Sequence, residues 1–302
     1  MAPAIVYGSP RPDVAIVPAG AVQASPLVPG AQALEAMADA SADEALVLAP
    51  PGALERGYVL AQALRILRPG GRLTALAPKD RGGSRLRAAL EAFGCAVREE
   101  ARRHHRICRV VRPDAAPGLA EAVAAGGPQV PPGLGLWSQP GIFSWDRLDP
   151  GSALLLAHLP PLAGQGADLG CGVGVLAGKV LQAPAVARLH LVDVDRRAVD
   201  AARRNLADPR AVFAWADARQ PGALPAELDF VVMNPPFHEA GAENRGLGAG
   251  LIGAAARALR KGGRCWLVAN RHLPYETVLA AQFAATRAVA EVEGFKVYEA
   301  RR

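Results

Sequence analysis

The second half of the chain alternates between strand-like and helix-like segments, and this alternation restricts the possible folds more than any other feature. The expected strands span residues 166–169, 188–194, 211–215, 229–233 and 264–269. The expected helices span residues 173–181, 195–206, 247–259 and 275–283. This order predicts an α/β fold with a parallel, doubly wound sheet and helices on both faces. Two more strands, near 288–291 and 295–299, predict an antiparallel hairpin at the sheet edge.

The first half repeats part of this pattern. A strand over 43–48 precedes Ala49-Pro50-Pro51-Gly52, and a helix then ends at Arg68-Pro69-Gly70-Gly71 before a strand over 72–77. In the second half, the strand over 229–233 precedes Asn234-Pro235-Pro236-Phe237, and the next helix ends at Arg260-Lys261-Gly262-Gly263. The shared Pro-Pro and Gly-Gly at similar spacing indicate an internal duplication.

A segment rich in Ala, Gly and Pro separates the two patterns. It covers residues 116–135, holds one short helical stretch and then breaks at Pro-Pro-Gly. The 302 residues also exceed the roughly 100–200 of one typical domain. We therefore expect a first domain over 1–115, a linker over 116–135 and a second domain over 136–302.

Composition indicates which class of partner and which cellular compartment to expect. The net charge of +6 favours polyanionic partners such as RNA, although many arginine-rich proteins are basic only for solubility. The four cysteines form no CxxC pair, so we expect neither a metal site nor disulfides. We find no signal peptide pattern and no apolar run near the ~20 residues of a membrane span. These observations predict a cytoplasmic protein without a membrane partner.

An arginine cluster over 98–112 is the strongest local charge feature. Its six arginines and two histidines can pair with phosphates, and they can equally form a solvated face of an ordinary edge element. The sequence leaves both readings open.

The segment Asp168-Leu169-Gly170-Cys171-Gly172-Val173-Gly174 joins the first strand of the second domain to its helix. Glycines here permit a tight turn and a close approach of a ligand to the backbone. Asp168 can order the turn or bind an ammonium group. Asp193 ends the next expected strand, where an acidic side chain suits the two hydroxyls of a ribose. Because 172–177 also fits the loose GxGxxA fingerprint, a nicotinamide-dependent oxidoreductase remains an alternative at this point.

The tetrapeptide Asn234-Pro235-Pro236-Phe237 favours another chemistry. It follows a buried strand, so it lies at the carboxyl edge of the sheet beside the cofactor crevice. The Asn234 side-chain oxygen and the Pro235 carbonyl can both accept hydrogen bonds from one exocyclic amine, and the ring of Phe237 offers a stacking face. This arrangement predicts methylation of a base nitrogen. Asp217, after the third strand, can accept a hydrogen bond from the adenine amine of the cofactor, or it can be a solvated turn residue.

The N-terminal copy lacks the residues of this site. It has Ala49 and Gly52 where Asn234 and Phe237 stand, and it has no DxGxG segment upstream. We expect it to be an inactive sister domain that helps to hold RNA.

On these residues, the chain resembles the ribosomal RNA small-subunit methyltransferase C family of guanine-N2 methyltransferases. The resemblance covers nearly the whole chain and rests on PGIFS at 140–144, LDPGS at 148–152, DLGCGVG at 168–174, NPPFH at 234–238, VANRHLPY at 268–275 and GFKVYEA at 294–300. It implies two tandem Rossmann-like methyltransferase domains, the N-terminal one degenerate, and S-adenosyl-L-methionine as the cofactor. It also implies ribosomal RNA or the small ribosomal subunit as the partner.

The expected site follows from the motifs and the resemblance together. The residues expected to hold the base are Asn234, Pro235, Pro236 and Phe237. The residues expected to bind the cofactor are Asp168, Gly170, Gly172, Gly174, Asp193, Asp217 and Asn234.

Several alternatives share parts of this site. Large-subunit guanine-N2 methyltransferases also carry NPPFH, and protein-glutamine and DNA-adenine N-methyltransferases use related loops. A non-catalytic RNA chaperone is disfavoured by the intact Asn234. The sequence does not define the oligomeric state, for which a monomer is the simplest expectation.

Overall fold

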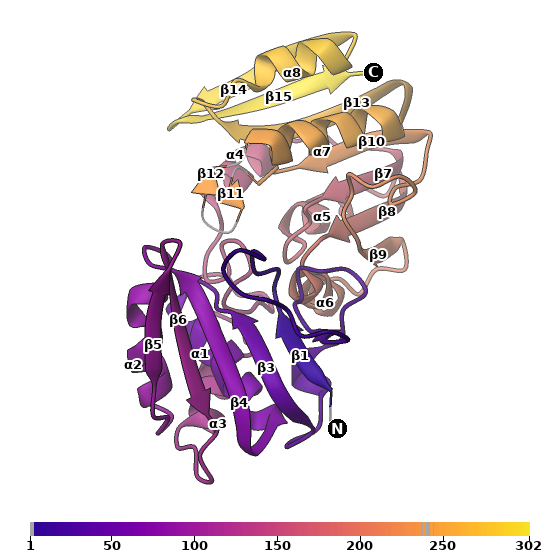
Figure 1. The fold of residues 1–302 in the computed structure, drawn as a ribbon. Coiled ribbons are helices and arrows are strands. Elements are labelled where there is room, and N and C mark those ends of the chain that lie inside the picture. The colour runs from indigo at the N-terminus through magenta and orange to yellow at the C-terminus, as the bar shows by residue number, and fades with distance from the viewer. Residues whose placement is uncertain (1–2, 237, 240–241, 244) are drawn as a thin grey trace. The chain divides into compact units, whose positions relative to one another are not determined.

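The computed structural model describes residues 3–236, 238–239, 242–243 and 245–302. The chain forms two compact units (Figure 1). One consists of Met1–Pro128 with Gln139–Gly141, and the other of Gln129–Ser138 with Ile142–Arg302. The segment expected as a linker contains helix α3 (Leu119–Gly126), which packs against α1 (Ala53–Ile66) of the first unit.

A seven-stranded sheet forms the centre of the second unit, in the order β14-β15-β13-β10-β7-β8-β9. Its strands are β7 (Gly164–Leu169), β8 (Val186–Asp193), β9 (Ala211–Trp215), β10 (Leu228–Met233), β13 (Leu259–Asn270), β14 (Ala285–Val292) and β15 (Phe295–Arg301). All pairings among the first five of these strands are parallel. β15 runs antiparallel to both β13 and β14, which confirms the predicted edge hairpin.

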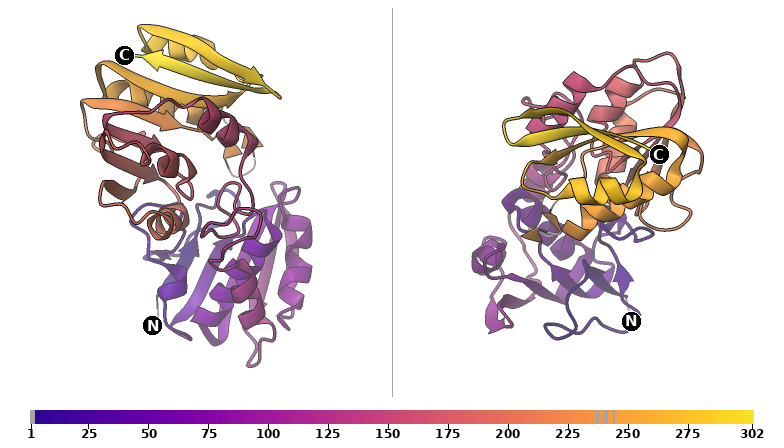
Figure 2. Two further views of the ribbon diagram at one scale, coloured as in Figure 1. Left: turned by 180° about the vertical axis from the view of Figure 1, so that it is seen from behind. Right: turned by 90° about the horizontal axis from the view of Figure 1, so that it is seen from above.

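Helices cover both faces of this sheet (Figures 1 and 2). They are α4 (Pro150–His158), α5 (Val175–Val180), α6 (Arg196–Asn205), α7 (Arg245–Ala258) and α8 (Tyr275–Gln282). Side chains alternate along β10: Val231 and Met233 pack with α7 and α8, whereas Phe230 and Val232 pack with α4 and α5. This alternation follows from the two-residue period of a strand. The doubly wound arrangement expected from the sequence is confirmed, while α4 and a short hairpin of β11 (His238–Glu239) and β12 (Ala242–Glu243) were not predicted.

The first unit has a six-stranded sheet in the order β2-β1-β3-β4-β6-β5. Its strands are β1 (Ala4–Tyr7), β2 (Val22–Gln23), β3 (Ala42–Leu48), β4 (Leu67–Pro78), β5 (Arg98–Arg102) and β6 (His105–Val111). The remaining helices of this unit are α2 (Leu86–Glu91) and two 3-10 turns at Leu34–Ala36 and Gly83–Arg85. The seven-stranded sheet of the second unit, taken in the opposite direction and without β9, has the order β8-β7-β10-β13-β15-β14. Each of these strands corresponds to the strand at the same place in the sheet of the first unit.

The two sheets also share one irregularity. Pairing between β3 and β4 jumps from Ala42↔Leu67 to Glu44↔Arg72, and pairing between β10 and β13 jumps from Leu228↔Leu259 to Phe230↔Arg264. The skipped residues form the Gly-Gly turn in each copy, and the first glycine of each turn has a positive φ, 78° and 80°. A matching bulge at matching strands supports the duplication inferred from the sequence.

The copies differ in what covers the second face of the sheet. In the first unit that face carries a small cluster of Val6, Val14, Leu46, Leu76 and Ile107, packed with loop residues around Val14. In the second unit the corresponding face is covered by α4 and α5. The first unit is therefore a reduced version of the second.

Gly166 in β7 makes room for a core aromatic ring. A Cβ at this position would lie 2.1 Å from Cε2 of Phe230, which is fully buried. Gly166→Ala should therefore lower the free energy of unfolding by about 3 kcal/mol, the upper range for overpacking a core. Urea unfolding measures the loss, and Gly178→Ala, where a Cβ finds only an ordinary 3.6 Å contact, is the matched control. Equal stability of the two variants would contradict the expectation.

Candidate functional site

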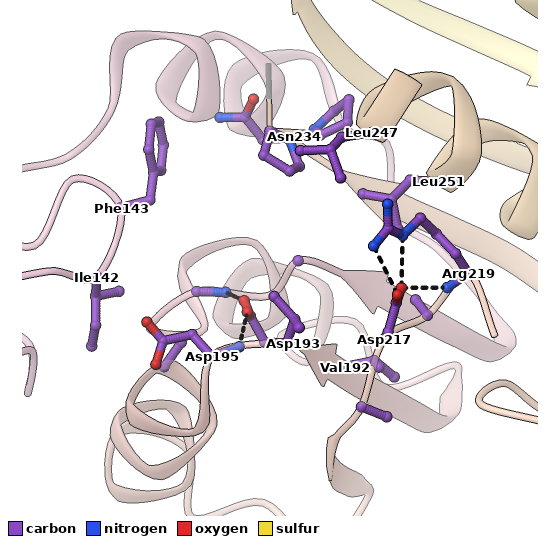
Figure 3. A pocket seen from close by; sticks show the side chains of 18 residues that line it. Ile142, Phe143, Val192, Asp193, Asp195, Asp217, Arg219, Asn234, Leu247 and Leu251 are labelled. Atoms are coloured by element: carbon purple, nitrogen blue, oxygen red, sulfur yellow. Dashed lines mark hydrogen bonds and ion pairs between the residues drawn. The ribbon is translucent and has the colours of Figure 1, made fainter. Parts of the chain in front are cut away.

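A pocket of about 260 Å³ opens at the carboxyl ends of the parallel strands in the second unit (Figure 3). Four successive strand ends contribute to it, because the carboxyl ends of parallel strands meet at one edge of a sheet. The lining residues after these strands include Gly170, Gly172, Asp193, Asp195, Asp217, Asn234, Pro235 and Pro236. The sequence motifs thus converge on one cavity.

The glycine turn after β7 has a backbone suited to a bound ligand. Gly170 and Gly172 have φ angles of 69° and 53°, and a Cβ on either would meet no atom within 4 Å. The space beside both residues is therefore open toward the pocket they line. Gly174 is not among the residues that line the pocket: a Cβ on it would lie 2.8 Å from Leu206 Cδ1, so this glycine permits close packing at the start of α5.

Asp193, at the end of β8, braces this turn. Its carboxylate accepts hydrogen bonds from the backbone N–H groups of Gly172 and Asp195, both at 2.9 Å. Burial nevertheless raises the pKa of Asp193 to about 6, with the neighbouring Asp195 adding to the rise. Because Asp193 also lines the pocket, its carboxylate can still accept hydrogen bonds from ligand hydroxyls.

Asp168 lies beneath the turn and does not line the pocket. It is fully buried, and its Oδ2 accepts a 3.1 Å hydrogen bond from Ala177 N. Its Oδ1 has no hydrogen-bond partner in the described part of the chain. Burial raises the pKa of Asp168 to about 7, and the charge of Asp193 contributes to this. An unpaired buried carboxylate oxygen next to a glycine cradle fits the expected cationic amino-acid moiety of the cofactor.

Asp217 lies across the pocket, after β9, and is held by Arg219 (Figure 3). The Arg219 guanidinium donates to both carboxylate oxygens at 2.8 Å and keeps the pKa of Asp217 below its usual value. Asp217 is thus an ionised, oriented acceptor at the pocket wall.

Asn234 follows β10 and has a fixed amide orientation. Its Nδ2 donates to Asp149 Oδ2 at 2.8 Å and to Ser152 Oγ at 2.9 Å. No donor to Asn234 Oδ1 occurs among the residues that the structure describes. Asn234 lines the pocket, and its side-chain oxygen is the amide atom that has no hydrogen-bond partner among these residues.

Two further residues complete the comparison with the sequence predictions. Phe237 lies outside the described residues. In the first unit, Ala49 is buried at the position that corresponds to Asn234, so this copy offers no side-chain acceptor there.

No role at the site was predicted from the sequence for several residues that line the pocket. They include Ile142, Phe143, Arg219, Leu247 and Leu251. Phe143 is 61% exposed and stands opposite Asn234 at the pocket (Figure 3). Asp149 and Ser152 belong to a motif quoted for the family resemblance, but no role followed from the sequence.

The arginine cluster forms the β5–β6 hairpin. Arg106 pairs with Glu99 at 3.3 Å and Arg109 pairs with Glu100 at 2.9 Å, which compensates part of the charge. Within the described residues, no helix has the length and apolar character needed to cross a membrane.

Known proteins share this architecture and these motifs. The family described as Methyltransferase small domain matches residues 133–299. Ribosomal RNA small subunit methyltransferase C of Pseudomonas putida (strain W619) is 35% identical over 265 residues, which are 86% of this chain and 80% of that protein. The protein of the same name from Pseudomonas aeruginosa (strain LESB58) is 34% identical over 278 residues, 91% of this chain and 84% of that protein. The solved T. thermophilus 16S rRNA N2 G1207 methyltransferase (RsmC), in complex with AdoMet and guanosine, matches with a TM-score of 0.74 and 27% identity, covering 89% of this chain and 75% of that one.

Proposed function

We infer the activity from one premise: the chain belongs to the methyltransferase small domain family and, within it, to the ribosomal RNA small subunit methyltransferase C family. Its function is the S-adenosylmethionine-dependent methylation of the N2 amine of a guanine in 16S ribosomal RNA. The small-subunit RNA is the partner that this function requires, and the intact small subunit and the naked RNA are both candidate substrates.

The single observation that supports this reaction at the described pocket is the orientation of Asn234. An exocyclic amine carries two N–H donors, so the group that holds it must present acceptors. Asn234 lines the pocket and directs its own donors to Asp149 and Ser152, so its Oδ1 remains available to accept a hydrogen bond.

We assign the remaining roles from this geometry. Asn234 Oδ1 and the Pro235 carbonyl accept the two N–H groups of the guanine amine and thereby favour a more pyramidal nitrogen with an available lone pair. Pro235 and Pro236 fix the backbone of this loop and keep the two acceptors in register. The guanine must leave its stack to reach the pocket, as enzymes that modify bases require.

The cofactor roles rest on the same pocket. When bound, S-adenosylmethionine supplies a methyl group activated by a sulfonium. The open faces of Gly170 and Gly172 admit the ligand against the backbone, Asp193 accepts from the ribose hydroxyls, and Asp217 accepts from the adenine amine. Asp168 balances the charge of the ammonium group. The reaction then depends mainly on alignment of the amine with the methyl group.

Product analysis tests this function directly. The full chain is incubated with labelled S-adenosylmethionine and with unmodified small subunits, naked 16S RNA or large-subunit RNA, and the RNA is digested to nucleosides. We expect label in N2-methylguanosine from small-subunit RNA. Label in another nucleoside, in large-subunit RNA or in protein glutamine would contradict the assignment.

Cofactor affinity should weaken as the pH falls through 7. The pKa values of Asp168 and Asp193, raised to about 7 and about 6 by burial, mean that both carboxyls take up protons in mildly acidic solution. A cofactor that binds the ionised forms must then displace these protons, so Kd at pH 5.5 should exceed Kd at pH 8 by roughly tenfold or more. Calorimetry in buffers of different ionisation enthalpy measures both Kd and proton release. In the Asp168→Asn variant, the part of the pH dependence of Kd that lies near pH 7 should be lost. A Kd that does not change with pH in the unmodified chain would refute the assignment of these carboxyls.

A further inference from the structure

Asp149 shares one carboxylate oxygen between two donors. Its Oδ2 accepts 2.8 Å hydrogen bonds from Ser152 N, at the start of α4, and from Asn234 Nδ2, at the end of β10. Ser152 Oγ lies 2.9 Å from the same Asn234 nitrogen. We propose that Asp149, assisted by Ser152, is a positioning residue that fixes the Asn234 amide with its oxygen available to the guanine amine. This inference rests on the proposed function of Asn234.

The chemistry of Asp149 determines which way the amide turns. An ionised carboxylate accepts hydrogen bonds and cannot donate them, so only the NH2 end of Asn234 can face it. A rotated amide would place Oδ1 against the Asp149 oxygen and leave two partial negative charges in contact. The 2.8 Å separation is in the range of a charge-assisted hydrogen bond, which is the stronger kind.

The start of α4 holds Asp149 itself in place. Asp149 is the N-cap residue, with extended backbone angles of −67° and 133°, and Pro150 follows at the first helical position. A Cβ on Gly151 would approach Asp149 Oδ2 and the ring of Phe295 to 3.0 Å, so this glycine leaves room for the carboxylate. Because α4 packs on β13 and β15, the carboxylate is anchored to the sheet that carries Asn234.

The orientation matters because the substrate nitrogen is a donor. A rotated Asn234 would present N–H groups to the N–H groups of guanine, and the amine would lose one of its two acceptors. A misplaced catalytic contact of this kind can cost roughly a hundredfold in rate. We therefore expect the effect of Asp149 to fall on kcat and to leave cofactor affinity unchanged.

Three substitutions separate positioning from helix capping. Serine caps helices about as well as aspartate, but its hydroxyl is too short to reach Asn234, whereas asparagine can supply an oxygen to both donors. Asp149→Ser should lower kcat by roughly 30-fold with an unchanged KM for RNA, and Asp149→Asn should recover most of this loss. Asp229→Ser is the matched control, since Asp229 also accepts a 2.8 Å backbone hydrogen bond, from Gln165, but lies at the start of β10, far along the strand from Asn234.

A double-mutant cycle tests whether Asp149 acts through Asn234. If it does, Asp149→Ser should add little to the loss already caused by Asn234→Ala in single-turnover assays. Wild-type kcat in the folded Asp149→Ser variant, or an equal loss of kcat in both backgrounds, would overturn the proposal. These outcomes leave the proposed function intact as long as Asn234→Ala alone abolishes most turnover. Wild-type turnover in Asn234→Ala would instead remove the role of Asn234 and this proposal with it.

Discussion

Asn234→Ala should lower kcat for guanine methylation by about a thousandfold and leave the Kd for S-adenosylmethionine within about threefold. The substitution removes the acceptor Oδ1 while the glycine turn, Asp193 and Asp217 remain. Loss of one preorganised polar contact in an active site typically costs about 10²–10³ in kcat. Asn234 is also the only member of the proposed base site whose acceptor is a side chain that alanine removes. Single-turnover transfer of labelled methyl groups to unmodified small subunits measures the rate, and calorimetry measures the affinity.

The matched control for this variant is Asn270→Ala. Asn270 ends β13, the strand beside β10, and the described pocket lining does not include it. It should retain turnover close to that of the unmodified chain. Turnover within about fivefold of the unmodified chain in Asn234→Ala would show that Asn234 does not hold the base.

Asp168→Asn should stabilise the cofactor-free chain at pH 8 and weaken cofactor binding. The ionised, fully buried carboxylate is costly: the rise of its pKa from 3.8 to about 7 corresponds to about 4 kcal/mol at roughly 1.4 kcal/mol per pKa unit. Asparagine removes the charge but buries amide N–H groups at a cost of about 1–3 kcal/mol. We expect a net gain of about 2 kcal/mol in the unfolding of the second unit, together with a roughly tenfold higher Kd for S-adenosylmethionine.

The pH dependence gives this prediction its sign. A carboxyl whose pKa is raised on folding is neutral in both states below about pH 4, so at that pH the gain from removing the charge is absent and only the cost of the buried amide should remain. Between pH 4 and 7 the Asp168→Asn variant should therefore change from less stable to more stable than the unmodified chain. Urea unfolding across this range measures it. Asp229→Asn provides the opposite control: burial acts to raise the pKa of Asp229, but the Gln165 N–H and Arg260 lower it on balance, so asparagine should destabilise. If Asp168→Asn instead destabilised the chain at pH 8, the ionised Asp168 carboxylate would have to be stabilised by other groups of the cofactor-free protein.

The strands of the second unit, and the location of the site at their carboxyl ends, were predictable because they depend on local sequence. A short apolar run bounded by turn residues, such as the one over 229–233, is typical of a buried strand, and parallel strands bring their carboxyl ends together. Gly170, Asp193, Asp217 and Asn234 follow four such strands, and the structure gathers all of them around one pocket. The duplication was also readable, because Pro-Pro and Gly-Gly recur where the shared bulge occurs.

The contacts across the sheet were not predictable in the same way. Asp149 and Asn234 are 85 residues apart, and their contact depends on how α4 docks. The helix itself has a recognisable start, an N-cap aspartate followed by proline, but its run of leucines carries no helical period. The burial of Asp168 was likewise hidden, because it depends on the first turn of α5 covering the carboxylate.

The common strand order of the two units has a consequence for how the chain reaches its native state. Equivalent strands such as β3 and β10 have equivalent neighbours and the same bulge. Before either sheet is complete, each of these strands can therefore pair in the place that belongs to the other. Tandem copies of one topology are prone to such misassembly. Synthesis from the N-terminus limits this mispairing. The first unit, whose sheet has loop residues rather than helices on its second face, can complete its sheet while the second unit is still being synthesised.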